Sequence, residues 1–127
     1  LNKKTSLGIT ICYDLRFPEL YNLLSKNCEV VINIANWPLE RIDHWRTLLK
    51  ARAIENQMYI VGVNRTGNDF NKFSYPSSSM VFGPKGNKCK PVYKTKIIGI
   101  YDIDIKEVAM SRKSFPSTYD RRNFLEI

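Results

Sequence analysis

The sequence has little of what disulfide-rich or zinc-binding proteins need. It contains one histidine and three cysteines, which are irregularly spaced and include no CxxC pair. An odd cysteine count at such spacing argues against a disulfide framework, and the lone histidine argues against a structural zinc site. No run reaches the roughly 18 apolar residues of a membrane helix, and no apolar signal-peptide core follows the first lysines. These absences predict a soluble, cytoplasmic protein with no membrane segment.

Acidic residues are few compared with basic ones. The chain has 12 Asp and Glu against 20 Lys and Arg, which gives a formal net charge of +8. A basic excess can bind nucleic-acid phosphates, and such a binder would show steep salt dependence. Much of the excess lies in 85–96, around a turn with Gly and Pro, and in 112–122 near the end, without any nucleic-acid-binding motif. We therefore interpret these lysines and arginines as solvated loop residues and expect no nucleic-acid partner.

What is present indicates one globular domain. The 127 residues are 43% hydrophobic and 12% aromatic, which suits a single domain over 1–127. Apolar periodicity predicts strands and helices in alternation, with Asp43 as the N-cap of the longest helix. We expect strands at 7–12, 30–35, 58–63, 80–82 and 97–105, helices at 18–24, 43–57 and 106–113, and a loop at 64–69. This order predicts a layered α/β fold.

Cys12 occupies a special place in this pattern. The first strand alternates bulky apolar residues with smaller ones, and Cys12 ends the small-residue face. Pro18 suits the first position of a helix, so Cys12 lies where a strand leads through a loop into a helix. A free thiol, with a pKa of about 8.5, needs a nearby base or positive charge, and exposed N–H groups there can hold an oxyanion. Cys12 is thus a candidate nucleophile, with a small buried core residue as the alternative. Cys28 and Cys89 have no such setting.

Other reactive side chains have simpler interpretations. His44 lies at the entry to the long helix with nothing local to orient it, so a structural or capping histidine is favoured over a base for Cys12. Arg52 and Glu55 are three residues apart on the same predicted helix, which indicates an intrahelical or buried ion pair.

Two long segments resemble the nitrilase, or carbon-nitrogen hydrolase, superfamily. GITICYDLRFPEL is similar to its nucleophile motif, and ANWPLERIDHWRTLLKARAIENQMYIVGVNRTGND is similar to the following segment in the omega-amidase-like branch. SSSMVFGPKG and RKSFPSTYDRR match more loosely, so the resemblance covers essentially the whole chain. It implies cofactor-free hydrolysis of a small-molecule amide through a thioester.

The resemblance also implies roles for individual residues. Cys12 would be the nucleophile, and the backbone N–H of Tyr13 would hold the oxyanion. Arg16 would either bind a substrate carboxylate or brace the loop, since an Arg fork suits both. Asn36 and Trp37 would stand near the pocket and bind substrate, although Trp37 could equally be plain core filling.

Two catalytic groups of the family are missing from the expected place. In the family, the general-base glutamate and the catalytic lysine both precede the cysteine. Here only eleven residues precede Cys12, and none of them is a glutamate. Lys3 and Lys4 lie too close to the first strand to match the family's lysine. We therefore predict the C-terminal half of an αββα sandwich, which needs an N-terminal half as partner and forms a homo-oligomer. The alternative is a catalytically incomplete fragment that acts only as a binding or assembly module.

Overall fold

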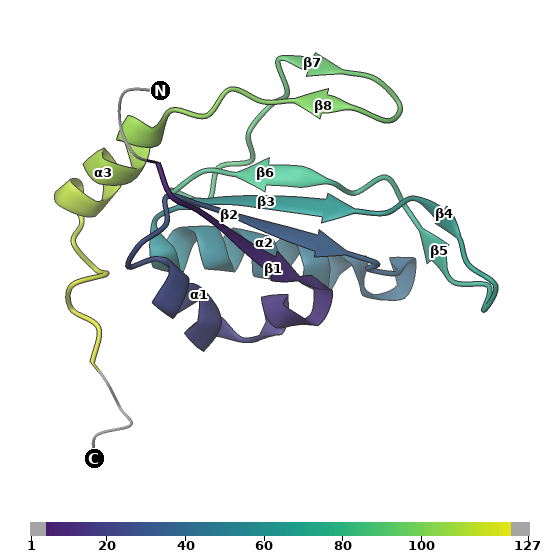
Figure 1. The fold of residues 1–127 in the computed structure, drawn as a ribbon, viewed down its shortest axis with the longest axis horizontal. Coiled ribbons are helices and arrows are strands. Elements are labelled where there is room, and N and C mark those ends of the chain that lie inside the picture. Colours follow the sequence, from purple (N-terminus) through teal and green to yellow (C-terminus); the bar gives the residue numbers. More distant parts are fainter. Residues whose placement is uncertain (1–4, 123–127) are drawn as a thin grey trace.

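A four-stranded sheet forms the centre of the computed structural model, which describes residues 5–122 (Figure 1). The strand order is β1-β2-β3-β6. The first three strands are parallel and β6 runs antiparallel to β3; their bounds are β1 (Leu7–Ile11), β2 (Val30–Ala35), β3 (Tyr59–Asn64) and β6 (Met80–Phe82). The β-branched residues of β2 and β3 favour these strands. The α/β fold class predicted from periodicity is confirmed.

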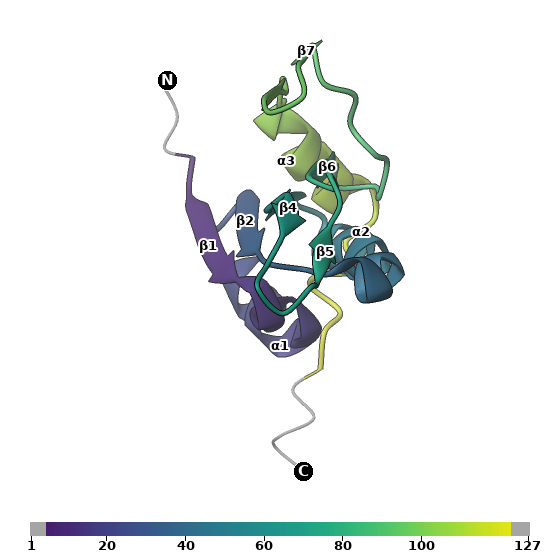
Figure 2. The same ribbon diagram turned by 90° about the vertical axis from the view of Figure 1, so that its right-hand side faces the viewer.

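Two helices cover one face of this sheet. Figure 2 shows α1 (Pro18–Leu24) and α2 (Ile42–Asn56) on the same side. The core between α2 and the sheet includes Trp45 and Leu49, both fully buried. A Cβ on Gly62 of β3 would lie 2.4 Å from a Leu49 methyl carbon and 2.7 Å from the Trp45 ring. The absence of a side chain at Gly62 therefore lets α2 approach the sheet closely.

The opposite face of the sheet is only partly covered. At one end, α3 (Ile105–Ser114) buries Val108 against the sheet residues Val30, Tyr59 and Val81. The rest of that face exposes large apolar side chains, which we call the open sheet face: Leu7, Ile9, Ile11, Ile34 and Val63, at 41–67% exposure. Parallel strands are normally buried on both faces. This face of the described residues thus lacks the cover that such strands usually have.

Two short turns and two hairpins complete the described chain. The 3-10 turn η1 (Cys12–Arg16) follows β1, and η2 (Leu39–Arg41) precedes α2. One hairpin pairs β4 (Gly67–Asn68) with β5 (Ser74–Tyr75), and the other pairs β7 (Tyr93–Lys94) with β8 (Gly99–Ile100). No helix within residues 5–122 has the length and apolar character needed to cross a membrane.

Several predicted boundaries were wrong. The N-cap of α2 is Arg41 and not Asp43, because η2 already starts the turn from Pro38; Asp43 lies in the first helical turn. The strand expected at 97–105 is reduced to β8, because this segment pairs only with β7 in its own hairpin. Asp104 then begins α3 as its N-cap, where its side chain accepts a hydrogen bond from the Lys106 N–H. β1 ends at Ile11, one residue before Cys12, and the loop expected at 64–69 contains β4.

Candidate active site

Cys12 is the first residue of η1, directly after β1. Its backbone has a φ of +45°, which is uncommon for a residue with a side chain and costs energy unless the surroundings enforce it. Asp14 helps to enforce it, because its Oδ2 accepts from the Ile11 N–H at 2.8 Å. In α/β-hydrolases, a strained turn between strand and helix exposes the nucleophile. The conformation of Cys12 is therefore suited to presenting its half-buried thiol.

All five predicted site residues line a single cavity of about 350 Å³. The lining is formed by Cys12, Tyr13, Arg16, Asn36, Trp37, Pro38 and Arg41. These residues follow the carboxyl ends of β1 and β2, the edge where ligands bind in open parallel sheets. Within residues 5–122, the lining includes two arginines and no carboxylate. The cavity thus places a thiol beside positive charge.

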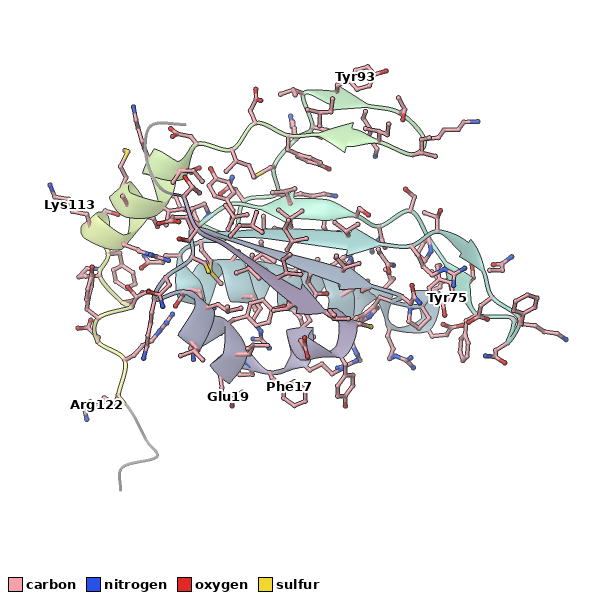
Figure 3. All side chains as sticks on the ribbon, viewed as in Figure 1. Phe17, Glu19, Tyr75, Tyr93, Lys113 and Arg122 are labelled. Carbon is pink, nitrogen blue, oxygen red and sulfur yellow. The ribbon has the colours of Figure 1, made fainter. Side chains whose placement is uncertain are left out.

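Arg16 is held by aromatic rings. Its guanidinium lies 4.9 Å from the centre of the Trp37 ring and 5.7 Å from that of Tyr13. Its Nη2 is 3.5 Å from Nδ1 of His44, so the histidine contacts Arg16. His44 is not among the residues that line the cavity. Phe17, whose ring packs edge-on against Tyr13, points away from the sheet (Figure 3). The stacking holds Arg16 at the cavity, which is consistent with the bracing role; binding of a substrate carboxylate stays a prediction.

Trp37 combines core packing with a place in the cavity wall. It is 3% exposed, its ring centre lies 5.4 Å from that of Trp45, and its Nε1 donates to the Arg41 carbonyl at 2.7 Å. Asn64, at the end of β3, holds its backbone from both sides. The Trp37 N–H donates to Asn64 Oδ1 at 2.7 Å, and Asn64 Nδ2 donates to the Trp37 carbonyl at 2.8 Å. The wall formed by Trp37 is therefore rigid.

Tyr13 follows Cys12 in η1 and its side chain is 64% exposed. The first N–H groups of a helical turn have no partners inside the turn. An oxyanion donor needs such a fixed N–H next to the nucleophile. The place of Tyr13 in η1 is consistent with the predicted backbone role, which stays a prediction.

The other two cysteines have a different environment. Cys28 is 8% exposed, and burial together with the nearby Glu29 raises the pKa of its thiol. Burial and Glu107 likewise raise the pKa of Cys89. A higher pKa leaves less thiolate at neutral pH, so both thiols are poor nucleophiles. In the described part of the chain no group of three or more His, Cys, Asp or Glu residues is placed to hold a metal ion.

Sequence reasoning missed two residues that shape this site. Arg41 lines the cavity, and the only signal for it was its position a short turn after the Asn36-Trp37-Pro38 break. Asn64 was assigned to a loop, because a hydrogen bond to a residue 27 positions away leaves no local pattern.

The fold and cavity define an α/β protein with a cysteine at the end of a parallel strand, beside an arginine-lined pocket. The family model described as carbon-nitrogen hydrolase matches residues 3–113, and the chain belongs to this family. It is 40% identical over 117 residues to the "Hydrolase in agr operon" of Staphylococcus aureus. This aligned region covers 91% of this chain and 44% of that protein. The chain is also 40% identical over 117 residues, with the same coverage, to the 2-oxoglutaramate amidase of Bacillus subtilis.

Solved structures agree with this assignment. The crystal structure of XC1258 from Xanthomonas campestris, a CN-hydrolase superfamily protein with an arsenic adduct in its active site, matches with a TM-score of 0.76 and 30% identity. The match covers 93% of this chain and 47% of that one. The fold is thus similar to nitrilase-superfamily structures, as the sequence predicted. The chain spans about half the length of the curated relatives it matches.

Proposed function

We propose that Cys12 is the nucleophile of an amidase of which this chain forms part. The Cys12 thiol would give its proton to a general base as its sulfur attacks the amide carbonyl carbon, and collapse of the tetrahedral intermediate would break the C–N bond while that proton passes to the leaving nitrogen, which departs as ammonia. Water would then attack the thioester, release the carboxylic acid and return the thiol. The Tyr13 N–H would hold the oxyanion in both steps. The observation that carries the proposal is the cavity that joins Cys12 to all the other predicted site residues.

The charge of the cavity supports an anionic amide as substrate. Arg16 and Arg41 line it together, and an arginine fork binds a carboxylate through two parallel hydrogen bonds. The monoamide of a dicarboxylic or keto acid carries such a carboxylate at the end away from the amide. The similarity to a relative named 2-oxoglutaramate amidase supports the same class.

We further propose that the general-base glutamate and the catalytic lysine come from an N-terminal half, in a longer parent or on a separate polypeptide. Residues 5–11 contain neither residue type, and Lys3 and Lys4 lie outside the described residues. The open sheet face supports this proposal, because a second sheet packed on it would bury its apolar side chains and complete an αββα sandwich. The assembled enzyme would be a homo-oligomer. An intact mass and the reading frame upstream of Leu1 test the partner half; an upstream stop, with no separate polypeptide that carries such a glutamate and lysine, would refute it.

The catalytic proposal is tested with Cys12→Ala in the parent protein. Hydrolysis of a dicarboxylic monoamide, followed as ammonia release, should fall to the uncatalysed rate while the unfolding midpoint stays unchanged. The matched control is Cys89→Ala, which should keep full turnover because Cys89 does not line the cavity. Retained turnover in Cys12→Ala contradicts the proposal.

A catalytically incomplete binding or assembly module is the second candidate. It is favoured by one observation, that no carboxylate or lysine of residues 5–122 lines the cavity. Alkylation with iodoacetamide near pH 7.5 separates the two candidates. A catalytic Cys12 should react faster than Cys28 and Cys89, because burial raises the pKa of both of these thiols. Uniformly slow labelling of all three cysteines would favour the module.

A further inference from the structure

Arg52 is a buried charge whose hydrogen bonds end on the turn that carries Cys12. It lies in α2 and is 5% exposed. Its Nε and Nη2 both donate to the Leu15 carbonyl oxygen, at 3.1 and 2.9 Å. Leu15 belongs to η1 and is fully buried. The long helix is therefore joined to the turn of the nucleophile by two hydrogen bonds from one side chain.

The guanidinium is held from its other sides as well. Its Nη1 donates to Oε1 of Glu55 at 3.0 Å, and its Cζ lies 5.6 Å from the centre of the Tyr21 ring. The Tyr21 hydroxyl is in turn 2.7 Å from Oγ1 of Thr10 and accepts from Nδ2 of Asn33 at 3.1 Å. Because its neighbours are themselves fixed, the guanidinium can act as a rigid support for η1.

A support for η1 matters because the backbone of Cys12, the first residue of this turn, has an unfavourable positive φ. A residue with a side chain keeps a φ of +45° only where surrounding contacts over-determine it. Asp14 ties the start of η1 to Ile11, and Arg52 ties its end to α2. We propose that Arg52 is a positioning residue, which acts through the Leu15 carbonyl to keep the Cys12 thiol and the Tyr13 N–H aligned for attack. This inference rests on the proposed function.

An ion pair with Glu55 alone would not give Arg52 this role. Buried ion pairs contribute little net stability, because desolvation offsets the attraction. If the pair with Glu55 were what mattered, Glu55→Gln would be the more harmful change, because it removes the negative charge while Arg52→Lys keeps a positive one. If the support of η1 is what matters, only Arg52→Lys should impair the turn, since a lysine lacks the planar fork and Glu55→Gln leaves both donors to Leu15 in place.

The experiment uses the parent enzyme and four variants: Arg52→Lys, Arg52→Gln, Glu55→Gln and the control Arg46→Lys. Arg46 lies on the same helix and pairs with Asp43 three residues earlier at 3.3 Å, but this pair is exposed. Arg52→Lys should lower kcat about tenfold to hundredfold, as expected for a small misplacement of a reacting group, with KM changed less than about threefold. Glu55→Gln and Arg46→Lys should keep at least about half of kcat.

Hydrogen exchange supplies a readout that does not depend on activity. The amides of η1 should exchange faster in Arg52→Lys and not in Arg46→Lys. If the proposed function is wrong, Cys12→Ala will stay active, whatever the hydrogen-exchange rates of η1 are. If this inference alone is wrong, folded Arg52→Lys will have the same kcat and the same η1 exchange rates as the wild type. Arg52→Gln replaces Arg52→Lys should the latter not fold. Failure of both to fold would also overturn the inference, because it would make Arg52 a requirement of the fold.

Discussion

At the scale of single residues, Arg41 gives the most direct test of what the cavity selects. It lines the cavity beside Arg16, and its backbone carbonyl, which accepts from Trp37, is kept in any substitution. We expect Arg41→Met to raise KM for a carboxylate-bearing amide by about tenfold or more, because a hydrogen bond to a charged group contributes about 1.5–3 kcal/mol. Steady-state kinetics on the parent enzyme measure this.

The matched comparison for Arg41 uses a neutral amide of similar length and a distant arginine. KM for the neutral amide should stay within about twofold of wild type in Arg41→Met, because that substrate has no carboxylate to lose. Arg46→Met, on the exposed side of α2, should leave both substrates unaffected. Equal losses for charged and neutral amides would show that Arg41 does not recognise the carboxylate.

The strand pattern placed Cys12, and the resemblance to the carbon-nitrogen hydrolases supplied the other four predicted site residues, all of which line the cavity; Arg41 was not predicted. Cys12 to Arg16 are neighbours in one motif, and Asn36 and Trp37 directly follow the next strand, so parallel strands bring them to one edge. Arg52 could be predicted only as a partner of Glu55, three residues away. Its bonds to Leu15 join residues 37 positions apart, and no local pattern indicates a contact of that range.

At the scale of elements, the end of β3 supports the segment that follows β2. The pairing of β2 with β3 ends at Ala35 and Asn64, and beyond it the Asn64 side chain holds the chain instead. It makes two hydrogen bonds with the Trp37 backbone and donates to Oγ of Ser78 at 2.9 Å. We expect Asn64→Ala to lower the free energy of unfolding by about 2–4 kcal/mol, since it leaves buried backbone groups unpaired. Urea unfolding of the parent protein measures the loss.

The control for Asn64 is Asn68→Ala, in the exposed hairpin strand β4. It should change the free energy of unfolding by less than about 0.5 kcal/mol, as is usual for surface positions. In Asn64→Ala, kcat/KM should fall together with stability because the Trp37 wall of the cavity loosens. A stable Asn64→Ala with normal kcat/KM would show that Trp37 is held by packing on Trp45 alone.

The elements were predictable to the extent that their pattern was local. Alternation and β-branched runs located β1, β2 and β3 within about one residue, because these strands pair within one buried sheet. The segment 97–105 has similar residues, yet Ile97 is 90% exposed and only β8 forms. Whether an apolar segment joins the main sheet depends on partners that its own sequence does not specify.

At the scale of the whole molecule, the open sheet face predicts how the chain behaves with and without the proposed partner half. The 127-residue chain alone should self-associate at micromolar concentration, because its exposed strand face and edge can pair with other copies. Ile9→Lys should reduce this association, as seen by light scattering. In the parent protein the same substitution should lower the free energy of unfolding by at least about 2 kcal/mol, since it would bury a charge where an isoleucine packs.

Leu23→Lys is the matched control for the open sheet face. Leu23 is 60% exposed, close to the 62% of Ile9, but it lies on α1, on the other side of the sheet. It should leave the stability of the parent within about 0.5 kcal/mol of wild type. If Ile9→Lys were equally harmless in the parent, the open sheet face would stay uncovered there and the proposed sandwich would be wrong.

The order of the sheet gives β1 a double role. Among the described strands it is an outer one, paired only with β2, and it is also the strand that ends at the strained Cys12. A polypeptide that adds a strand to β1 would pair with the same stretch of backbone that leads into Cys12. If the proposed function holds, association at this edge would also bear on the nucleophile, and ammonia released on mixing two separately expressed halves would report that they had recombined.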